Sequence, residues 1–383
     1  MHGSIRAVAL LSAIGAVNAA THHMIVGTFG TKFLYTVEFD DEALTLELIA
    51  NTTVPNANSW LNLNHDKSAL YGNLYGGTGF MSYSLENGSI THTATVATGG
   101  GNCTASAIFQ VADHNPPYAL YGAFFSSSAS GTSGSAGCGA VLSVDETGAL
   151  VEVIQNFTYH ETTSAVHGSV ISPDSKFLYS ADDTENSLWT HSIDSSTGLV
   201  TYVDELEAHV EGADPRHVAI HPNGTYLYVV MEGSSQIAQY TVDPTTGTPT
   251  FENVTYPLLA NGLNATLYWA DEVVLSSSGK YLWATNRGRS AKGFISAFTL
   301  ADDGAIVSQN FLIETTTSGG AANAVSPSPF SDRFVALTDS LTGFVEIWEM
   351  SEDASSAAVV AHLDIIDAVV AGKGCCANAV WYS

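Results

Sequence analysis

The sequence predicts an all-β fold, a seven-bladed β-propeller, on three observations. Units of about fifty residues recur along the 383-residue chain. Each unit divides into four short strands separated by turns, which is the make-up of one propeller blade. The two ends of the chain hold complementary parts of one further unit. With 45% hydrophobic and 13% charged residues, the chain has the composition of a folded protein with a large core, not of a disordered one.

The first unit from the N-terminus is incomplete. The segment "HMIVGTFGTKFLYTVEFDDEALTLELIA" holds three alternating strands and has no innermost strand before them. The next two units are "SWLNLNHDKSALYGNLYGGTGFMSYSLENGSI" and the cysteine-containing stretch 104–154, which includes a Ser/Gly-rich loop at 126–137. Both show the four-strand pattern more weakly than the units that follow.

Three clear repeats occupy the middle of the chain. They are "HGSVISPDSKFLYSADDTENSLWTHSIDSSTGLVTYV", "RHVAIHPNGTYLYVVMEGSSQIAQYTVDPTTGTPTFE" and "DEVVLSSSGKYLWATNRGRSAKGFISAFTLADDGAIV". Each begins with a short apolar strand and a turn, continues with an alternating strand such as "KFLYSA" or "TYLYVV" and a polar loop, and ends with a third strand and a D/T/G turn. This order predicts the same blade three times.

The C-terminal part completes the ring. A weaker sixth unit is "NAVSPSPFSDRFVALTDSLTGFVEIWEM", and the last segment, "CANAVWYS", resembles an innermost strand. Because the N-terminal unit lacks that strand, we expect the N-terminal strands to pair with the C-terminal strand in a seventh blade. Closure of this kind removes exposed sheet edges.

The N-terminus has the pattern of a secretory signal peptide. Residues 1–19, "MHGSIRAVALLSAIGAVNA", combine an Arg, an apolar run and small residues before a cleavage site. We therefore predict a signal peptide at 1–19 and a single propeller domain at 20–383, since no linker divides the rest. The apolar run is too short to cross a bilayer and no later run reaches about 20 residues, so we expect no membrane span.

Sequons and cysteines fit a secreted protein. Seven sequons follow the leader, at Asn51, Asn87, Asn102, Asn156, Asn223, Asn253 and Asn264. Their density predicts a glycoprotein that is extracellular or associated with a cell wall. Four cysteines allow three pairings in an oxidising compartment, and we favour Cys103 with Cys138. The adjacent Cys375 and Cys376 either bond to each other or pair with the other two. No CxxC spacing or nearby His pair accompanies the cysteines, so we predict no metal site.

Basic residues are scarce, which makes their positions informative. Eleven Lys and Arg against 38 Asp and Glu give a formal net charge of −27, and such a surface repels nucleic acid. After the leader the arginines are Arg216, Arg287, Arg289 and Arg333. Three of these four lie within the two last clear repeats.

The repeat register places several polar residues in two rings. The first ring, at the start of the innermost strand, holds His167, Arg216 and Asp271, with Ser59 and Asn323 in weaker units. The second, after the second strand, holds Asp183, Glu232 and Arg287, with Asp339 and Tyr75 in weaker units. The first two strands of a blade are antiparallel, so the start of one and the end of the other share one end of the blade. We therefore expect both rings to line one mouth of the central channel.

Other charged residues near this mouth have simpler interpretations. His217 and His221 resemble a metal pair, but four residues along a strand separate them by about 13 Å, too far to share one ion. We interpret both as structural. Arg289 lies in the loop after Arg287 and is expected to add positive charge to the mouth.

At this point the chain resembles the seven-bladed propeller lactonases. The resemblance covers the whole mature chain and is most specific in "HGSVISPDSKFLYSADD", "DPRHVAIHPNGTYLYVVMEGS" and "SSSGKYLWATNRG". The family includes bacterial 6-phosphogluconolactonases and fungal carboxy-cis,cis-muconate cyclases, and the "TNRG" stretch is more similar to the cyclases. The cyclase active site is proposed to hold a His, two Arg and a Glu. The matching positions here are His167, Arg216, Glu232 and Arg287.

The resemblance implies an isomerase that closes a lactone on a carboxy-muconate-type diene acid. A substrate carboxylate would add to the conjugated alkene while Arg216 and Arg287 bind carboxylates. Glu232 is the candidate acid/base that transfers the proton to carbon, and His167 either shares that task or polarises a carboxylate. Asp183, Asp271 and Arg289 are expected to contact the small anionic acid or lactone. This chemistry requires no metal or organic cofactor.

Two alternatives stay open. A secreted lactone hydrolase would use the same mouth with water as the nucleophile. A non-catalytic cell-wall glycoprotein or adhesin would use only the scaffold and its outer loops, because fold does not decide function. The signal peptide, the sequons and the paired cysteines depart from the catabolic cyclase, which is expected inside the cell.

Overall fold

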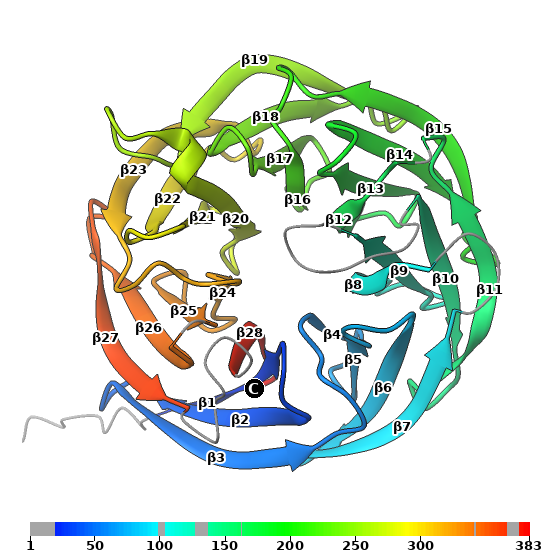
Figure 1. The fold of residues 1–383 in the computed structure, drawn as a ribbon, viewed down its shortest axis with the longest axis horizontal. Helices are drawn as coiled ribbons and strands as arrows, with labels where there is room; N and C mark the ends of the chain where they lie inside the picture. Colours follow the sequence, from blue (N-terminus) through cyan, green and yellow to red (C-terminus); the bar gives the residue numbers. More distant parts are fainter. Residues whose placement is uncertain (1–19, 99–103, 127–136, 162, 341, 366–374) are drawn as a thin grey trace, which may run out of the picture.

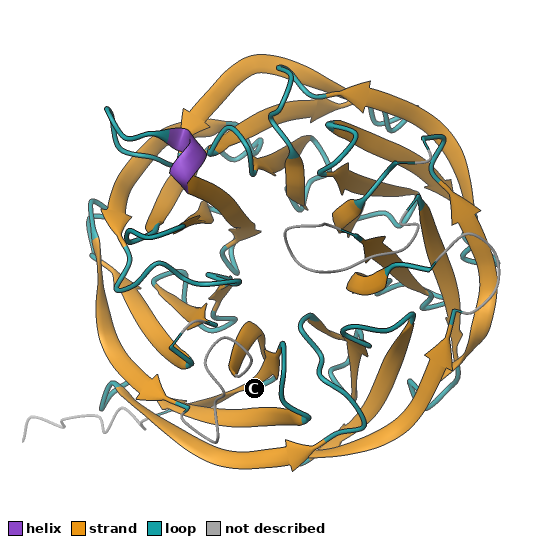
Figure 2. Cartoon of the chain, viewed as in Figure 1, coloured by secondary structure: helices purple, strands orange, loops and turns teal. Residues whose placement is uncertain are grey.

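The strands of the molecule form a ring of seven sheets. A computed structural model describes residues 20–98, 104–126, 137–161, 163–340, 342–365 and 375–383. Within these residues 28 strands form seven four-stranded antiparallel sheets around a central axis (Figure 1). The helical structure in this part of the chain is a short 3₁₀ turn, η1 (Ala265–Leu267), coloured purple in Figure 2. The predicted all-β, seven-bladed propeller is confirmed.

Each sheet is one blade, and we number the blades by the chain order of their innermost strands. Blade 1 contains β4 (Leu61–Leu63), β5 (Ala69–Asn73), β6 (Gly79–Glu86) and β7 (Ser89–Ala97). Blade 2 contains β8 (Ser106–Ala112), β9 (Leu120–Phe125), β10 (Cys138–Val144) and β11 (Leu150–Thr158). Blade 3 contains β12 (Val166–Ile171), β13 (Phe177–Asp182), β14 (Ser187–Ile193) and β15 (Val200–Glu207).

The remaining blades follow the same order from the axis outward. Blade 4 contains β16 (Pro215–Ile220), β17 (Tyr226–Met231), β18 (Gln236–Val242) and β19 (Pro249–Pro257). Blade 5 contains β20 (Tyr268–Leu275), β21 (Tyr281–Gly288), β22 (Phe294–Leu300) and β23 (Ile306–Glu314). Blade 6 contains β24 (Val325–Pro327), β25 (Phe334–Asp339), β26 (Phe344–Met350) and β27 (Ala357–Asp364).

Blade 7 joins the two ends of the chain. Its innermost strand is β28 (Cys375–Trp381), followed outward by β1 (Thr21–Thr28), β2 (Phe33–Asp40) and β3 (Thr45–Thr53). The strands β28 and β1 are antiparallel, with Met24 opposite Trp381 and Val26 opposite Ala379. The predicted closure by the C-terminal strand is confirmed.

The core lies between neighbouring blades. Each of the seven clusters of buried hydrophobic residues joins two consecutive blades of the described chain, for example Leu188 of blade 3 with Val218 and Leu227 of blade 4. A repeated tyrosine hydrogen bond supports this packing. The hydroxyl of Tyr121 donates to the Gly198 carbonyl and that of Tyr179 to the Gly247 carbonyl, each at 2.9 Å. The Tyr in "FLYS" therefore reaches the D/T/G turn of the next blade.

The cysteine alternatives are partly resolved. Cys375 and Cys376 are bonded to each other at the start of β28, and both are buried. Cys138 begins β10 and is buried as well. Its proposed partner Cys103 lies outside the described residues, so the Cys103–Cys138 pairing stays a prediction. The predicted signal peptide and the sequon at Asn102 also lie outside them.

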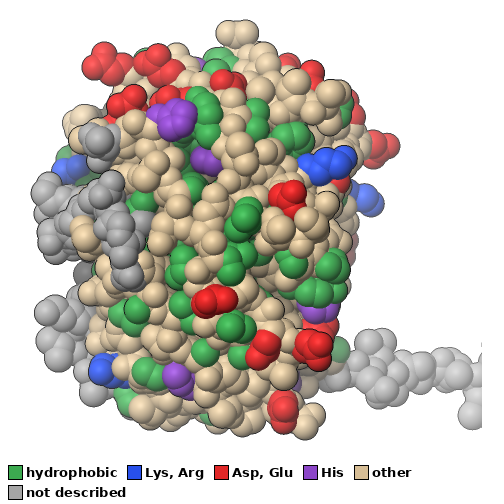
Figure 3. Space-filling view, turned by 90° about the vertical axis from the view of Figure 1, so that its right-hand side faces the viewer, with side chains coloured by type: hydrophobic (Ala, Val, Ile, Leu, Met, Phe, Trp, Pro, Cys, Tyr) green, Lys and Arg blue, Asp and Glu red, His purple; other side chains and the backbone are tan. Residues whose placement is uncertain are grey.

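The surface matches the acidic composition. Figure 3 shows Asp and Glu side chains spread over one side of the ring, with fewer Lys and Arg. Six sequon asparagines are exposed: Asn51, Asn87, Asn156, Asn223, Asn253 and Asn264. In the described ranges we find no helix that is long and apolar enough to cross a membrane.

Candidate active site

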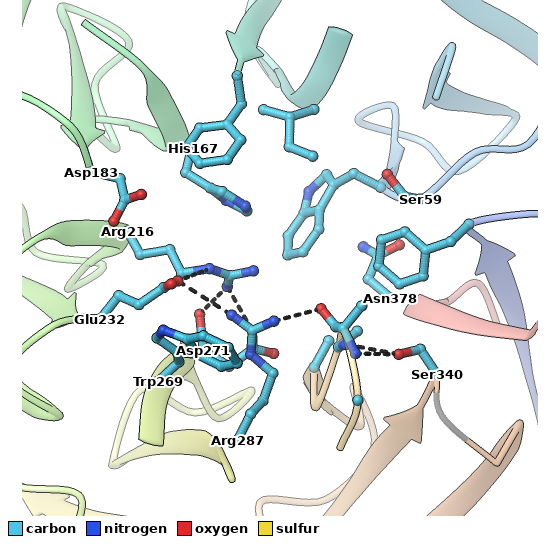
Figure 4. A pocket seen from close by; sticks show the side chains of 18 of the residues that line it. Ser59, His167, Asp183, Arg216, Glu232, Trp269, Asp271, Arg287, Ser340 and Asn378 are labelled. Carbon is cyan, nitrogen blue, oxygen red and sulfur yellow. Dashed lines mark hydrogen bonds and ion pairs between the residues drawn. The ribbon is translucent and has the colours of Figure 1, made fainter. Parts of the chain in front are cut away.

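A cavity of about 450 Å³ opens at the centre of the ring. Its lining comes mainly from the innermost strands and from the ends of the second strands (Figure 4). Eight of the ten positions in the two predicted rings line it: Ser59, Tyr75, His167, Asp183, Arg216, Glu232, Asp271 and Arg287. The register of the repeats therefore located the cavity correctly.

The two remaining ring positions, Asn323 and Asp339, are not part of the cavity lining. Asn323 donates its backbone N–H to Asp271 Oδ2 at 2.8 Å and its side-chain amide to the Asn286 carbonyl. Asp339 accepts the backbone N–H of Thr342 at 2.7 Å. Both residues support loops of blades 5 and 6.

β-Bulges aim the key side chains of three consecutive blades at the axis. In β12 the register with β13 shifts at His167, and in β16 the register with β17 shifts at Arg216. In β20 the shift falls between Ala270 and Val273, at Asp271 and Glu272. A bulge adds an unpaired residue to one strand and changes the direction of its side chain. The same local irregularity therefore presents a His, an Arg and an Asp from equivalent positions.

Two arginines and two carboxylates form the charged centre of the cavity. Arg216 Nε lies 2.8 Å from Glu232 Oε2, and Arg216 Nη1 lies 2.9 Å from Asp271 Oδ1. Arg287 Nη2 donates to Glu232 Oε2 at 3.3 Å, and Arg287 Nε lies 3.0 Å from Asp271 Oδ1. Each carboxylate therefore bridges both guanidinium groups (Figure 4).

Several of these contacts are ionic without being well-formed hydrogen bonds. The Nε–H groups of Arg216 and Arg287 and the Oδ1 atom of Asp271 lack an aligned hydrogen-bond partner within the described residues, despite the short distances. A hydrogen bond weakens steeply when the donor is misaligned. The guanidinium groups are thus paired with carboxylates by charge but are not saturated with hydrogen bonds.

Asp271 anchors the arginines. Its side chain is 2% exposed. Burial alone would raise its pKa, but Arg216 and Arg287, together with the Asn323 N–H, lower the pKa below the usual value. Asp271 lines the cavity as predicted, and its oxygens are directed at the arginines.

Asp183 has the opposite electrostatic setting. It is half-buried at the cavity wall. Burial, followed by the negative charges of Glu232 and Asp214, raises its pKa well above the usual value. Asp183 therefore holds a proton to a higher pH than an ordinary aspartate.

His167 faces the cavity and contacts a second histidine, His217. Its Nδ1 lies 2.9 Å from Nε2 of His217, whose Nδ1 lies 2.9 Å from Glu272 Oε1. Burial first, and then the positive charge of Arg216, hold the pKa of both imidazoles well below the usual range. Both rings are neutral at physiological pH.

Glu272 and the aromatic residues that line the cavity were not predicted from the sequence. The repeat register selected the neighbouring Asp271, so Glu272 was not singled out from the sequence. The cavity lining also includes the apolar residues Phe29, Trp60, Ile108, Phe125 and Trp269, of which Trp269 lies beside Arg287. Aromatic residues at strand ends are common in propeller cores, so their sequence positions alone gave no distinctive signal.

Arg289 lies at the rim of the cavity rather than in its lining. It is exposed, and its guanidinium stacks 4.0 Å from the centroid of Trp269, which lines the cavity. The Arg287 guanidinium lies 5.5 Å from the same ring. Arg289 therefore adds positive charge outside the mouth.

A metal-ligand cluster is not formed by the described residues, where no three His, Cys, Asp or Glu side chains are arranged to hold an ion. His217 and His221, which resemble a metal pair in sequence, have different surroundings. His217 contacts His167 and Glu272, whereas His221 accepts the backbone N–H of Asn223 at 3.4 Å.

Comparison with known proteins gives a consistent result. Residues 23–353 match the family described as "Lactonase, 7-bladed beta-propeller". The chain is 37% identical over 380 residues to the carboxy-cis,cis-muconate cyclase of Neurospora crassa, covering 94% of this chain and 99% of the relative. It is 28% identical over 367 residues to muconate cycloisomerase 1 of Cutaneotrichosporon cutaneum, covering 88% and 93%.

Solved structures support the same fold. The periplasmic gluconolactonase PpgL of Pseudomonas aeruginosa superposes with a TM-score of 0.76 at 18% identity, covering 95% of this chain and 99% of that one. A putative 6-phosphogluconolactonase of Bacteroides fragilis has a TM-score of 0.75 at 17% identity, with 96% and 99% covered.

Proposed function

The chain belongs to the seven-bladed β-propeller lactonase family, and from this premise we propose that it is a carboxy-cis,cis-muconate cyclase, an isomerase that closes a lactone ring. The observation that carries the proposal is the pair of guanidinium groups beside a cavity-facing histidine. The four residues that the cyclase resemblance selects, His167, Arg216, Glu232 and Arg287, all line one cavity.

The cavity matches a planar, multiply charged diene acid. One half is charged, with Arg216 and Arg287 at its centre, and the other half is apolar, with Trp60 and Phe125. A guanidinium group binds a carboxylate through paired N–H donors. A conjugated chain can lie against the aromatic rings while its carboxylates reach the arginines. Charged and apolar parts of such a substrate thus have separate partners.

The arginines also match the charge that develops during cyclisation. When one carboxylate oxygen adds to the alkene, the electron pair moves toward the neighbouring carboxyl group and forms an enolate-like anion. Donors already fixed in place stabilise such an anion without reorganising. Asp271 holds both arginines from behind, so their positions are set before the substrate arrives.

His167 is the better proton-transfer group of the two predicted candidates. Glu232 Oε2 is shared by Arg216 and Arg287, so this oxygen is already engaged by two guanidinium groups. The Nδ1 atom of His167 is engaged by His217, so Nε2 is the nitrogen that remains for the substrate. We assign the proton transfer to His167 and assign Glu232 to orienting the arginines.

We also propose that the protein is secreted as a glycoprotein, with association to a cell wall as one destination. The leader-like residues 1–19 and the seven sequons motivate this part of the proposal. The exposure of the six described sequon asparagines is compatible with glycosylation. A secreted cyclase would meet aromatic breakdown products outside the cell.

Ultraviolet absorbance tests the activity directly. We expect the purified protein to remove the diene absorbance of 3-carboxy-cis,cis-muconate. Replacing Arg216 by Lys keeps the charge but loses the paired donors, and should lower kcat/KM by at least about 10²-fold. Folded wild-type protein that leaves the diene unchanged would contradict the proposal, and hydrolysis of an added lactone would then favour the hydrolase.

A matched control separates chemistry from stability. Arg216→Ala leaves two buried carboxylates short of a partner and should cost about 3–5 kcal/mol of stability, so Arg216→Lys is the more informative variant. Arg333 pairs with Glu349 at 2.7 Å in blade 6 and is not part of the cavity lining. Arg333→Lys should leave the rate unchanged.

A further inference from the structure

Three polar side chains from neighbouring blades form a continuous chain that ends at the cavity. His167 comes from β12, His217 from β16 and Glu272 from β20. The Nδ1 atom of His167 contacts His217 Nε2 at 2.9 Å, and His217 Nδ1 contacts Glu272 Oε1 at 2.9 Å. The side chains of His217 and Glu272 are 3% and 5% exposed. This series of hydrogen-bonded side chains therefore has one end at the cavity and the other in the protein interior.

The chain is enclosed by aromatic rings. Trp60 lies edge-on to His217 with ring centroids 4.8 Å apart, and Phe109 lies 5.4 Å from the same ring. Phe125 contacts His167 at 4.9 Å. These rings offer His217 no competing hydrogen bond. Each ring nitrogen of His217 contacts one partner, Nε2 with His167 and Nδ1 with Glu272, which fixes the order of the three residues.

The surrounding charges oppose a positive imidazole. Burial lowers the pKa of His167 and His217, and the positive charges of Arg216 and Arg287 lower it further. Asp271 and Glu232 act in the opposite direction on His217 without compensating. A proton taken up by either ring would therefore be unstable there.

Glu272 is suited to hold that proton instead. Burial and the adjacent Asp271 raise its pKa well above the usual value, against the lowering effect of Arg216. Its Oε1 also accepts the backbone N–H of Val273 at 3.1 Å. The charged groups around the three side chains are thus Arg216, Arg287, Asp271 and Glu232. The group that most readily binds a proton is Glu272, at the end of the series away from the cavity.

We propose that Glu272, His217 and His167 form a proton relay that supplies the proton of the lactone-forming step. This inference rests on the proposed cyclase function and adds two residues to its site. His167 is the catalytic residue of the three because it faces the substrate. His217 and Glu272 act through it and are positioning residues that also carry the proton.

The proton transfers can take place without forming a positively charged imidazole. Before reaction Glu272 is a carboxylic acid that donates to His217 Nδ1, His217 donates from Nε2 to His167 Nδ1, and His167 presents Nε2–H to the cavity. A substrate carboxylate oxygen forms the C–O bond, and the alkene electron pair takes the proton from His167 Nε2. The protons of His217 and Glu272 each move one hydrogen bond along the chain. Glu272 is left as a carboxylate, and a proton from water restores it.

The relay gives the site two neutral-ring states. With Glu272 protonated, His167 carries its proton on Nε2 and is an acid toward the cavity. With Glu272 ionised, His167 carries its proton on Nδ1 and presents a lone pair, which suits the reverse reaction. A lone histidine would need to become an imidazolium beside two arginines to deliver the same proton.

Kinetics of Glu272→Gln test the relay. An amide cannot pass a proton on, so His167 can act only as an imidazolium, whose pKa is low in this site. We expect kcat at pH 7 to fall by about 10²-fold with KM unchanged, and the rate to recover toward acid pH. His217→Gln should give the same acid shift. A merely structural role would leave the shape of the pH profile unchanged.

The control is a similar buried pair outside the cavity. Glu346 in blade 6 is 1% exposed and contacts His362 Nδ1 through Oε1 at 3.0 Å. Glu346→Gln removes a buried glutamate beside a histidine and should leave the pH profile of kcat unchanged. An equal acid shift in Glu346→Gln would attribute the effect to general destabilisation and overturn the relay.

A measurement without substrate separates the relay from the proposed function. Nitrogen NMR of ¹⁵N-histidine-labelled protein reports which ring nitrogen of His167 carries the proton. In Glu272→Gln the amide oxygen should keep accepting the Val273 N–H and so must also accept from His217, which places the proton of the neutral His167 ring on Nδ1. The wild-type protein should hold it on Nε2 while Glu272 is protonated.

Each result has a clear meaning. A His167 tautomer that differs between wild type and Glu272→Gln, but not between wild type and Glu346→Gln, supports the relay even if the wild-type protein proves inactive on carboxymuconate. The same tautomer in wild type and Glu272→Gln from pH 5 to 10 overturns it, even if the protein is an active cyclase.

Discussion

At the scale of single residues, the site depends on opposite settings of neighbouring carboxyl groups. Asp271 lies between two arginines, which lower its pKa, whereas Asp183 lies near Glu232 and Asp214, which raise its pKa in addition to burial. Groups with pKa values pushed apart can serve different roles at one pH. Asp271 is the anion that holds the arginines, and Asp183 keeps its proton to a higher pH than an ordinary aspartate does.

Asp183→Asn tests this assignment through stability. The folded protein holds the Asp183 proton to a higher pH than the unfolded chain, whose aspartate titrates near about 3.9. The contribution of Asp183 to wild-type stability should therefore fall as pH rises from about 4 through the folded pKa and be constant above it. Asn does not titrate, so the variant should lose less stability over that range.

Urea unfolding midpoints measured from pH 4 to pH 8 check this expectation. Asp302→Asn, a change at an exposed loop position, serves as the control and should follow the wild-type curve. If Asp183→Asn and wild type lose stability in parallel across the range, Asp183 is ionised in the folded protein like any surface carboxyl. Turnover near neutral pH should survive in Asp183→Asn, because Asn resembles the protonated acid in shape and charge.

At the scale of elements, the bulged innermost strands set the geometry of the site. The bulges in β12, β16 and β20 present His167, Arg216 and Asp271 to the cavity, and they also bring the three strands close together. At Gly168, β12 passes close to β16. A Cβ atom built on Gly168 would lie 2.5 Å from the His217 ring and 2.8 Å from the Arg216 carbonyl.

Gly168→Ala should therefore impair both stability and catalysis. The added methyl group must push β12 away from β16, since one neighbour is backbone, and this lengthens the His167–His217 contact. We expect a fall in kcat of about 10-fold or more, of the size that small misplacements of catalytic groups produce. Kinetics at a temperature where the variant is folded, shown by circular dichroism, provide the measurement.

Gly139→Ala is the matched control for this substitution. A Cβ on Gly139 in β10 would lie 2.2 Å from the Phe157 ring, so it crowds the outer part of blade 2 rather than the cavity. Gly139→Ala should lower the melting temperature but leave kcat unchanged. Normal kcat in folded Gly168→Ala would show that β12 and β16 can separate without affecting the site.

The strands and turns explain which parts of the fold and the site could be predicted from the sequence. The repeat period and the D/T/G turns predicted the seven blades and the closing strand, because each blade repeats one local pattern. The same register predicted Arg216 and Glu232 at one mouth, since equivalent positions of a ring face one axis. The bulges were not predictable, because a one-residue shift depends on pairing between strands. Glu272 was missed and His217 was interpreted as structural for this reason: their side-chain directions follow from the bulges.

At the scale of the whole molecule, ring closure depends on contacts between blade 7 and blade 1. Asn378 in β28 accepts the Leu61 N–H through Oδ1 at 2.8 Å and donates from Nδ2 to the Leu61 carbonyl at 3.1 Å. A side-chain amide thus pairs with the backbone of β4 as a neighbouring strand would. Asn378 also lines the cavity, so closure and site geometry are linked.

Asn378→Ala should weaken closure. The substitution leaves the Leu61 N–H and carbonyl without their partner at a buried position, which costs about 1–3 kcal/mol for each unsatisfied group. We expect a lower melting temperature by calorimetry and faster proteolysis near the chain ends. Asn62→Ala, which removes one hydrogen bond to the Ala112 N–H between blades 1 and 2, is the comparison. An equal or smaller effect of Asn378→Ala would mean that closure relies on the β28–β1 strand pairing alone.

The distribution of sequons over the ring bears on where the protein acts. Asn51 lies in β3, Asn156 in β11 and Asn253 in β19, three outermost strands on different sides of the ring, while the cavity mouth carries His167 and Arg216. Glycans at such positions would cover the rim and leave the axis open to a small acid. We therefore expect the protein isolated from its native culture medium to lose mass on treatment with an endoglycosidase, while its diene-cyclising rate stays the same. Protein found only inside the cell, with an unshifted mass and an intact leader, would contradict the secreted glycoprotein and return the cyclase to an intracellular setting.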